Sequence, residues 1–285
     1  MSGYKSFAIV GAGLIGGTIA EELLKAKTEG VVDKIVLLSR PNSVSKLDTY
    51  SARGATVVPV EDYSSVQEVS KALSGVEVVF STLSHLVLDL ELPIAEAAKA
   101  AGAQLFVPSE YGLSTDGHTN GILASKAAVD KQIRALGIAT TRFFVGMFGD
   151  IIWSPFLGLD LKGTVLIGGD GSAKVSFTST EDIGRFVVFV LTKLSREEVK
   201  NRTFRIEGER TSYNDIFAAY EKKHGVQVTV QHVPIEDMEA TVAKDSHDVV
   251  TYLRLAWAKG AGTVGSPLDN GVFPDWNPRP VIHYL

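Results

Sequence analysis

Residues 7–16 read Phe-Ala-Ile-Val-Gly-Ala-Gly-Leu-Ile-Gly, an apolar run that leads directly into a glycine-rich turn. The glycines have the spacing G-x-G-x-x-G, and the residues after them have helical spacing. In such a turn Gly11 permits the tight bend, Gly13 lets the backbone approach a diphosphate, and Gly16 lets the helix pack against the strand. A plain strand-to-helix turn is the alternative. The context favours a dinucleotide site at the positive end of the helix, formed by Gly11, Gly13, Leu14, Ile15 and Gly16.

Beyond this turn the chain alternates short β-rich runs with longer segments of helical period, as far as residue 144. Runs rich in Val, Ile, Leu and Phe are typical of buried parallel strands, and their alternation with helices is typical of α/β proteins. The pattern predicts an α/β fold of the Rossmann type, with a doubly wound parallel sheet. The predicted strands are 7–10, 35–39, 56–60, 76–81, 105–108 and 140–144, and the predicted helices are 15–27, 94–101 and 120–136.

After Phe148 this alternation weakens, and short runs broken by glycine replace it. Two further helices are predicted at 180–194 and 211–224, and the tail from Gly265 is expected to be irregular cover. We therefore expect a domain of residues 1–150 and a smaller α+β lobe of residues 151–285. No long linker separates them, so the lobe is expected to pack on the first domain rather than to fold independently.

The composition argues against several classes of protein. A formal net charge of −5, with no clustered run of Lys or Arg, gives no electrostatic footprint for nucleic acid. The absence of cysteine excludes disulfides and thiolate metal sites and fits a reducing compartment. No signal-peptide pattern precedes the first strand, and no apolar run reaches the roughly 18 residues of a membrane span. We expect a cytoplasmic monomer or homodimer that binds no nucleic acid, membrane or metal.

The end of the second predicted strand indicates which nucleotide is preferred. NAD sites usually place Asp or Glu there, whereas this chain has Ser39 and Arg40, followed by Lys46. A guanidinium can bind a 2′-phosphate through a planar, permanently charged fork. The alternative is that Arg40 and Lys46 are solvated loop residues. The set favours NADPH/NADP+ over NADH, and Asp62 and Tyr63, after the third strand, are candidates for the adenine edge.

The familiar tyrosine–lysine pair of short-chain dehydrogenases is absent. That pair places a tyrosine four residues before a lysine on one helix face, but here Ile122 stands four residues before Lys126. Any proton transfer by this helix must therefore use the lysine without that tyrosine.

The segment Pro108-Ser109-Glu110-Tyr111-Gly112 resembles the Pro-Ser-Glu-Phe-Gly signature of the NmrA-like, isoflavone-reductase-like branch of atypical short-chain reductases. The resemblance continues through Lys126-Ala127-Ala128-Val129, then Val175-Ser176-Phe177, and extends from Lys5 to about Gly225. It implies that Lys126 contacts the nicotinamide ribose and transfers the substrate proton. A surface helix lysine is the alternative interpretation.

Further residues are candidates for the nicotinamide end of the site. Ser81, Thr82 and Leu83 end the fourth strand, at the sheet edge where ligands bind in open α/β folds. The resemblance adds Pro108 and Ser109 to the cofactor-binding set. Tyr111 replaces the family's usual phenylalanine, so its hydroxyl is either a second proton donor or part of a packing residue.

A dense aromatic stretch follows the nucleotide domain and suits an aromatic or phenolic substrate, although part of it is expected to be ordinary core. Its candidate substrate-binding members are Phe143, Met147, Phe148 and Trp153, together with Tyr111. We expect an NADPH-dependent oxidoreductase that reduces such a small molecule in the C-terminal lobe. The alternatives are a quinone or carbonyl reductase of the same group, and a non-catalytic NAD(P)-sensing regulator that binds a protein partner. The regulatory members of the family lack the lysine, so Lys126 distinguishes the two classes.

Overall fold

The computed structural model describes residues 3–245 and 248–285. Contacts within the chain divide it into two compact units. Unit 1 comprises Met1–Glu110, Lys126–Phe143 and Ile183–Phe204, and unit 2 comprises Tyr111–Ser125, Phe144–Asp182 and Arg205–Leu285. The chain thus passes between the units repeatedly, whereas the sequence predicts one boundary at residue 150.

Unit 1 is built on a five-stranded parallel sheet with the strand order β3-β2-β1-β4-β5, which confirms the predicted α/β fold. Its central strand β1 pairs with β2 on one side and with β4 on the other, so that Ala8 lies between Val36 and Val79. The order reverses at β1, and the crevice at the carboxyl ends of β1 and β4 is where open α/β sheets bind ligands. The strands are β1 (Ser6–Val10), β2 (Lys34–Ser39), β3 (Thr56–Pro59), β4 (Val78–Ser81) and β5 (Leu105–Val107).

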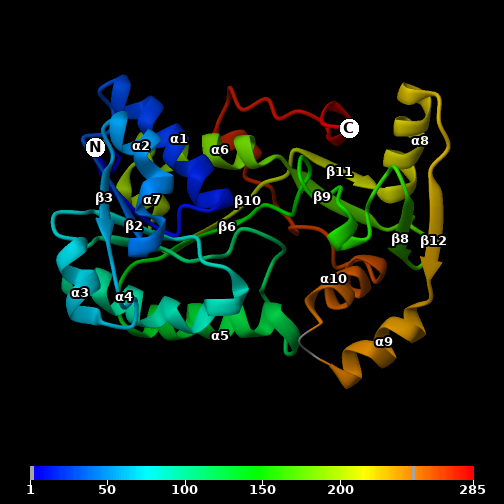
Figure 1. The fold of residues 1–285 in the computed structure, drawn as a ribbon, viewed down its shortest axis with the longest axis horizontal. Coiled ribbons are helices and arrows are strands. Elements are labelled where there is room, and N and C mark those ends of the chain that lie inside the picture. The colour runs from blue at the N-terminus through cyan, green and yellow to red at the C-terminus, as the bar shows by residue number, and fades with distance from the viewer. Residues whose placement is uncertain (1–2, 246–247) are drawn as a thin grey trace. The chain divides into compact units, whose positions relative to one another are not determined.

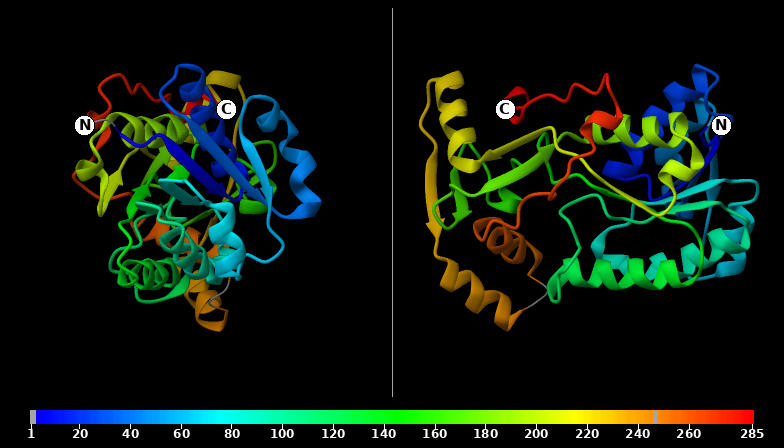
Figure 2. Two further views of the ribbon diagram at one scale, coloured as in Figure 1. Left: turned by 90° about the vertical axis from the view of Figure 1, so that its left-hand side faces the viewer. Right: turned by 180° about the vertical axis from the view of Figure 1, so that it is seen from behind.

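Helices cover both faces of this sheet. Figures 1 and 2 show α1 and α6 on one face and α3, α4 and α5 on the other. Val10, Val79, Ile94 and Ile133 belong to one buried cluster between the sheet and the second set of helices. The helices are α1 (Leu14–Thr28), α2 (Asp48–Ala52), α3 (Val66–Ala72), α4 (Glu91–Ala100), α5 (Gly121–Ala135), α6 (Thr180–Lys193) and α7 (Arg196–Val199), with short 3₁₀ helices η1 (Pro41–Leu47) and η2 (His85–Leu90).

The sixth predicted strand exists as β6 (Thr141–Phe144), but it lies in a two-stranded sheet with β10 (Arg202–Arg205). An isolated bridge between Phe106 and Thr140 is its link to β5. The residues before β10 also hold the start of β6, since Thr141 Oγ1 donates to Val199 O at 2.6 Å. A segment about 60 residues away in sequence thus pairs with this strand, which local periodicity does not reveal.

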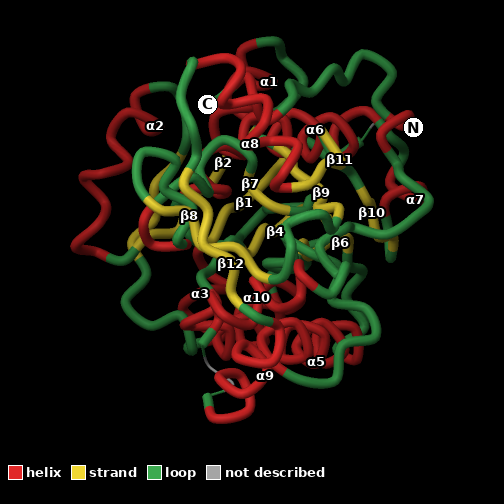
Figure 3. Tube along the Cα trace, turned by 90° about the vertical axis from the view of Figure 1, so that its right-hand side faces the viewer, coloured by secondary structure: helices red, strands yellow, loops and turns green. Residues whose placement is uncertain are grey.

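Unit 2 contains two small sheets. β7 (Met147–Phe148), β9 (Lys174–Thr178) and β11 (Glu209–Ser212) form one, and β8 (Thr164–Gly168) pairs with β12 (Thr229–Val233) in the other. Figure 3 shows β8 and β12 side by side, with α10 next to them. The remaining elements are α8 (Tyr213–His224), α9 (Ile235–Lys244), α10 (Val249–Ala258), η3 (Pro155–Leu157), η4 (Asn270–Val272) and η5 (Val281–His283).

The helix predicted at 211–224 begins later, because residues 211 and 212 belong to β11. Ser212 ends that strand and caps α8, with its hydroxyl accepting from Asp215 N at 3.2 Å. A Ser followed three residues later by an acidic residue is a helix-start signature, so the capping box sets the true boundary.

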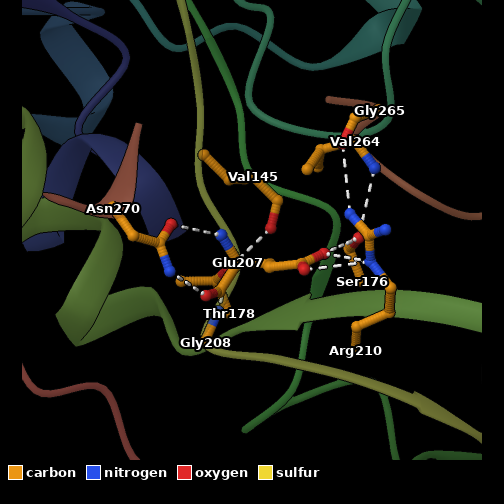
Figure 4. Close-up of polar contacts among 9 residues, drawn as sticks. All are labelled: Val145, Ser176, Thr178, Glu207, Gly208, Arg210, Val264, Gly265 and Asn270. Atoms are coloured by element: carbon orange, nitrogen blue, oxygen red, sulfur yellow. Dashed lines mark hydrogen bonds and ion pairs between the residues drawn. The ribbon is translucent and has the colours of Figure 1, made fainter. Parts of the chain in front are cut away.

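A buried carboxylate anchors the C-terminal tail of unit 2. Figure 4 shows Glu207 receiving a hydrogen bond from Ser176 and an ion pair from Arg210, whose Nε lies 2.9 Å away. The same two partners bind the tail: Ser176 Oγ accepts from Val264 N at 3.1 Å, and Arg210 Nη2 donates to Gly265 O at 3.1 Å. The tail is irregular, as predicted, yet it is bound to the β9–β11 pair by a specific polar network.

Candidate active site

The glycine turn joins β1 to α1 and leaves the start of the helix uncovered by any side-chain cap. Gly13 is the N-cap residue, and the first turn of α1 contains no acidic residue. Gly11 has a positive φ of 95°, a conformation that glycine adopts without strain. Free backbone N–H groups and the helix dipole therefore provide an anion site at this end of α1.

The glycines have different surroundings. A Cβ added to Gly13 would meet no atom within 4 Å, so the space beside this residue is open. A Cβ added to Gly16 would lie 2.1 Å from Gly11 O and 2.5 Å from Thr82 Oγ1. Gly16 is therefore required by the fold, whereas the open space at Gly13 fits the close approach of a ligand. Of the two apolar members of the predicted set, Leu14 is exposed and Ile15 is buried.

The residues predicted for the ribose end gather after β2 and β3. Ser39 is buried at the end of β2, and the exposed Arg40 precedes η1, on which Lys46 is also exposed. Burial raises the pKa of Tyr63 to about 12, while the nearby Arg40 charge opposes this rise. Arg40 and Tyr63 follow the adjacent strands β2 and β3, at the edge of the sheet where a 2′-phosphate and an adenine would bind.

Asp62 is already engaged by its own loop. Its Oδ1 accepts from Ser64 Oγ at 2.6 Å and from Ser64 N at 2.8 Å. These two hydrogen bonds lower the pKa of Asp62, with the hydroxyl contributing more. The arrangement shapes the turn before α3, and Asp62 Oδ1 already accepts two hydrogen bonds within this loop.

The end of β4 is tied to the glycine turn. Thr82 Oγ1 donates to Gly11 O at 2.5 Å and contacts Val10 O at 3.1 Å, so the predicted Thr82 supports the turn from behind. Ser81 is fully buried, and Leu83 packs on the core of unit 1. These residues therefore shape the site chiefly through backbone position and packing.

Lys126 projects from α5 to the loop after β5. Its Nζ donates to Ser109 O at 2.5 Å, and the side chain is half-buried. Ser109 is itself fixed, because its hydroxyl donates to Leu83 O at 2.8 Å and its N–H donates to Glu91 Oε1 at 2.8 Å. The structure thus brings together Lys126, Ser109 and the end of β4 at the carboxyl edge of the sheet, beside the buried Pro108.

The predicted substrate-binding residues divide between the units. Phe143 is fully buried in unit 1, where it stacks on Phe204 with ring centroids 5.4 Å apart, so we assign it to the core. The other four lie in unit 2. Tyr111 is buried, Met147 and Phe148 form β7, and Trp153 stacks on Phe177 while its Nε1 donates to Gly149 O at 2.8 Å.

Two residues of this region escape sequence reasoning. Glu91 is a carboxyl only 2% exposed, in the first turn of α4. Tyr50, on α2, places its hydroxyl 3.2 Å from the position that a Cβ on Gly17 would occupy, next to the first turn of α1. Glu91 stands between two leucines, but so does Asp89 in the same segment, and Asp89 is exposed, so the sequence does not single out Glu91.

Comparison with known proteins gives a consistent result. The sequence model of the NmrA-like family matches residues 4–259. The phenylcoumaran benzylic ether reductase IRL1 of Ginkgo biloba is 28% identical, over 99% of this chain and 98% of its own. Leucoanthocyanidin reductase of Vitis vinifera in complex with NADPH has a TM-score of 0.82 at 21% identity, covering 97% of both chains. AtPrR2 with NADP+ and (+)-pinoresinol also has a TM-score of 0.82, at 23% identity over 99% and 98%.

None of the helices in the described ranges is both long and apolar enough to span a membrane.

Proposed function

This chain belongs to the NmrA-like family, and we propose that it is an NADPH-dependent reductase of a small aromatic or phenolic molecule, with Lys126 as its general acid–base residue. The observation that carries the proposal is the position of Lys126. Its Nζ is held at Ser109 O, at the carboxyl edge of the sheet. Hydride acceptors in open α/β proteins bind at this edge.

The residues present fit NADPH. The uncapped start of α1 and the open space beside Gly13 would receive the diphosphate. Arg40 would bind the 2′-phosphate, with Ser39 and Lys46 nearby and Tyr63 against the adenine. Ser81, Thr82, Leu83, Pro108 and Ser109 would border the nicotinamide end. When bound, the cofactor supplies a hydride.

Lys126 would handle the proton that accompanies this hydride. Its ammonium has three donors, and one of them is directed to Ser109 O, which fixes the side chain and leaves the others free to contact a ribose hydroxyl or the substrate oxygen. As the hydride arrives, negative charge develops on the substrate, and a proton from Nζ neutralises it. Solvent then restores the proton at Nζ.

The proposed substrate class rests on the relatives and on unit 2. The similar proteins include reductases of phenylcoumaran benzylic ethers and a structure with (+)-pinoresinol, all aromatic compounds. In unit 2, Met147, Phe148 and Trp153 are only half-buried and offer aromatic and thioether surface. Tyr111, which is buried in the same unit, would contribute packing and a second hydroxyl.

The proposal is tested by separating binding from turnover. NADPH binding is measured by fluorescence, and NADPH oxidation is followed with a panel of phenylcoumarans, furanofuran lignans, isoflavones and quinones. We expect at least one phenolic class to be reduced. Lys126→Met should lower kcat by roughly 100-fold or more, a larger factor than any increase in the Kd for NADPH.

Lys131→Met provides the matched control, because Lys131 is an exposed lysine on the same helix. Full turnover by Lys126→Met would remove the lysine from the mechanism. Tight NADPH binding with no turnover across the panel would instead favour an NAD(P)-sensing regulator.

A further inference from the structure

Glu91 is a buried carboxyl that the proposed reaction does not use. It begins α4 and is 2% exposed. A carboxylate taken out of water is costly unless hydrogen bonds or an opposite charge compensate it. The groups around Glu91 therefore indicate its task.

The first contact links Glu91 to the residue that holds the lysine. Glu91 Oε1 accepts from Ser109 N at 2.8 Å, and Ser109 O accepts from Lys126 Nζ at 2.5 Å. The two hydrogen bonds lie on either side of one Cα, and the Ser109 side chain is held at Leu83 O. The hydrogen bonds of its N–H and its side chain consequently restrain Ser109, the residue whose carbonyl binds Lys126.

The second contact is electrostatic. Burial raises the pKa of Glu91, while the Ser81 hydroxyl, the Ser109 N–H and the charge of Lys126 oppose that rise. The charge of Asp130 raises the pKa of Glu91. The Asp130 carboxylate is itself paired with Arg134, whose Nε lies 2.8 Å away, and Arg142 Nη1 lies 3.6 Å from it. The charge of Lys126 thus acts on Glu91, and both side chains are hydrogen-bonded to Ser109.

We propose that Glu91 is the positioning residue of Lys126: by accepting from Ser109 N, it holds in place the residue whose carbonyl binds the Lys126 ammonium. The inference rests on the proposed role of Lys126. It assigns to Glu91 both a geometric effect, through Ser109, and an electrostatic effect, through its charge.

Substitution separates the two effects. Glu91→Gln keeps an oxygen that accepts from Ser109 N but removes the charge, whereas Glu91→Leu removes both. Glu96→Gln is the matched control, because Glu96 lies on the exposed side of the same helix. A purely structural Glu91 would be replaced by Gln with little effect on any property of Lys126.

The decisive measurement follows Lys126 directly. The protein is labelled with [ε-¹³C]lysine, and the Lys126 resonance, assigned by its loss in Lys126→Arg, is titrated by NMR. Loss of a nearby anion favours the neutral amine, so the titration midpoint should fall in Glu91→Gln and stay unchanged in Glu96→Gln. The alkaline limb of kcat should move in the same direction and by the same amount.

The outcomes distinguish the two proposals. An unchanged NMR midpoint in Glu91→Gln overturns the positioning role, whether or not the protein is a reductase. If Lys126→Met retains full turnover, the proposed mechanism fails even where the midpoint has moved. Glu91→Leu adds the geometric effect, and we expect it to lower kcat further than Glu91→Gln at similar NADPH affinity.

Discussion

Gly13 and Gly16 belong to one sequence motif, but the structure gives them separate tasks. Gly13→Val should leave the free protein folded, because a Cβ at this position meets no atom within 4 Å. The same side chain would occupy the path of the diphosphate, so NADPH binding should weaken at least about 100-fold. Gly16→Ala should instead lower stability by more than about 2 kcal/mol, because its Cβ meets the backbone of Gly11. Thermal melts and NADPH titrations of both variants measure the two effects.

The control for this pair is Gly271→Ala, which adds a Cβ where no atom lies within 4 Å, far in sequence from the turn and from the Pro108–Gly112 signature. Full NADPH affinity in Gly13→Val would show that the turn is only structural.

Arg40 is exposed directly after β2, and we predict that it selects the nucleotide. A charge-assisted hydrogen bond is worth about 1.5–3 kcal/mol, which corresponds to roughly 10- to 100-fold in affinity. Arg40→Asp should therefore weaken NADPH by at least that factor and change NADH much less. Competition titrations of both nucleotides measure the ratio, with Arg53→Gln as the control arginine, since Arg53 pairs with Glu21 instead. An unchanged ratio would exclude Arg40 from the site.

Residue-scale reasoning from sequence succeeds where the signal is local. The spacing of the glycines and the position of Lys126 depend on neighbours in the chain, and the structure places them together at one sheet edge. Local sequence does not predict the surroundings of Glu91 and Phe143, because other segments of the chain form them. Glu91 is buried by the loop after β5, and Phe143 is covered by Phe204, which is 61 residues later in the sequence.

At the scale of an element, the start of α8 should make stability depend on pH. The Lys174 hydrogen bond, followed by those from Ser212, lowers the pKa of Asp215 to about 2, below its ordinary 3.8. A carboxyl with a lowered pKa in the folded state stabilises the fold above about pH 4 and loses that effect as the pH falls to about 2. The Tm difference between wild type and Asp215→Asn should therefore be largest near neutral pH and vanish near pH 2.

Lys174→Met removes the largest cause of that shift, so it should reproduce most of the pH dependence of Asp215→Asn. Because the pair is exposed, 1 M salt should reduce the effect. A Tm difference that stays constant from pH 7 to pH 2 would contradict the assignment.

A second prediction at this scale concerns the polar network around Glu207 that binds the C-terminal tail. Glu207→Leu should lower the free energy of unfolding by about 2–4 kcal/mol, because Ser176 and Arg210 lose a buried partner. It should also expose residues 264–285 to limited proteolysis. Glu197→Gln is the surface control: Glu197 pairs with Lys200 while its side chain is 74% exposed, and such pairs contribute about 1 kcal/mol or less. Equal losses in both variants would refute the anchoring role.

The boundaries of strands can also be predicted where the signal is local, and not where the pairing partner is distant in sequence. The sequence predicts the five strands of the parallel sheet to within two residues at each end, because each contains a run of consecutive apolar residues. The short strands of unit 2 were not. β7 has two residues, and β12 is largely exposed and pairs with β8 about 60 residues earlier, so neither has a periodic pattern of its own.

At the scale of the whole molecule, the residues proposed to bind the cofactor and those proposed to bind the substrate belong to different units. The glycine turn, Arg40, Ser109 and Lys126 all belong to unit 1, whereas Tyr111, Met147, Phe148 and Trp153 belong to unit 2. Because Glu110 and Tyr111 are neighbours in sequence, one short signature contributes to both units. The proposed cofactor and substrate sets are therefore joined covalently at this point, although each is fixed by the packing of its own unit.

Hydrogen exchange tests this separation directly. A ligand that binds only the folded state slows exchange through opening reactions that release it, by about 100-fold at 100 times its Kd. NADPH alone should therefore protect amides of residues 11–18, 40–46 and 81–84 in unit 1, and a reducible phenolic ligand should be needed to protect residues 147–153 in unit 2. Residues 229–233 of β12, far in sequence from both sets, serve as the internal reference. If NADPH alone protected 147–153 as strongly as 11–18, this segment would belong to the nucleotide site, and the proposed assignment of unit 2 to the substrate would be wrong.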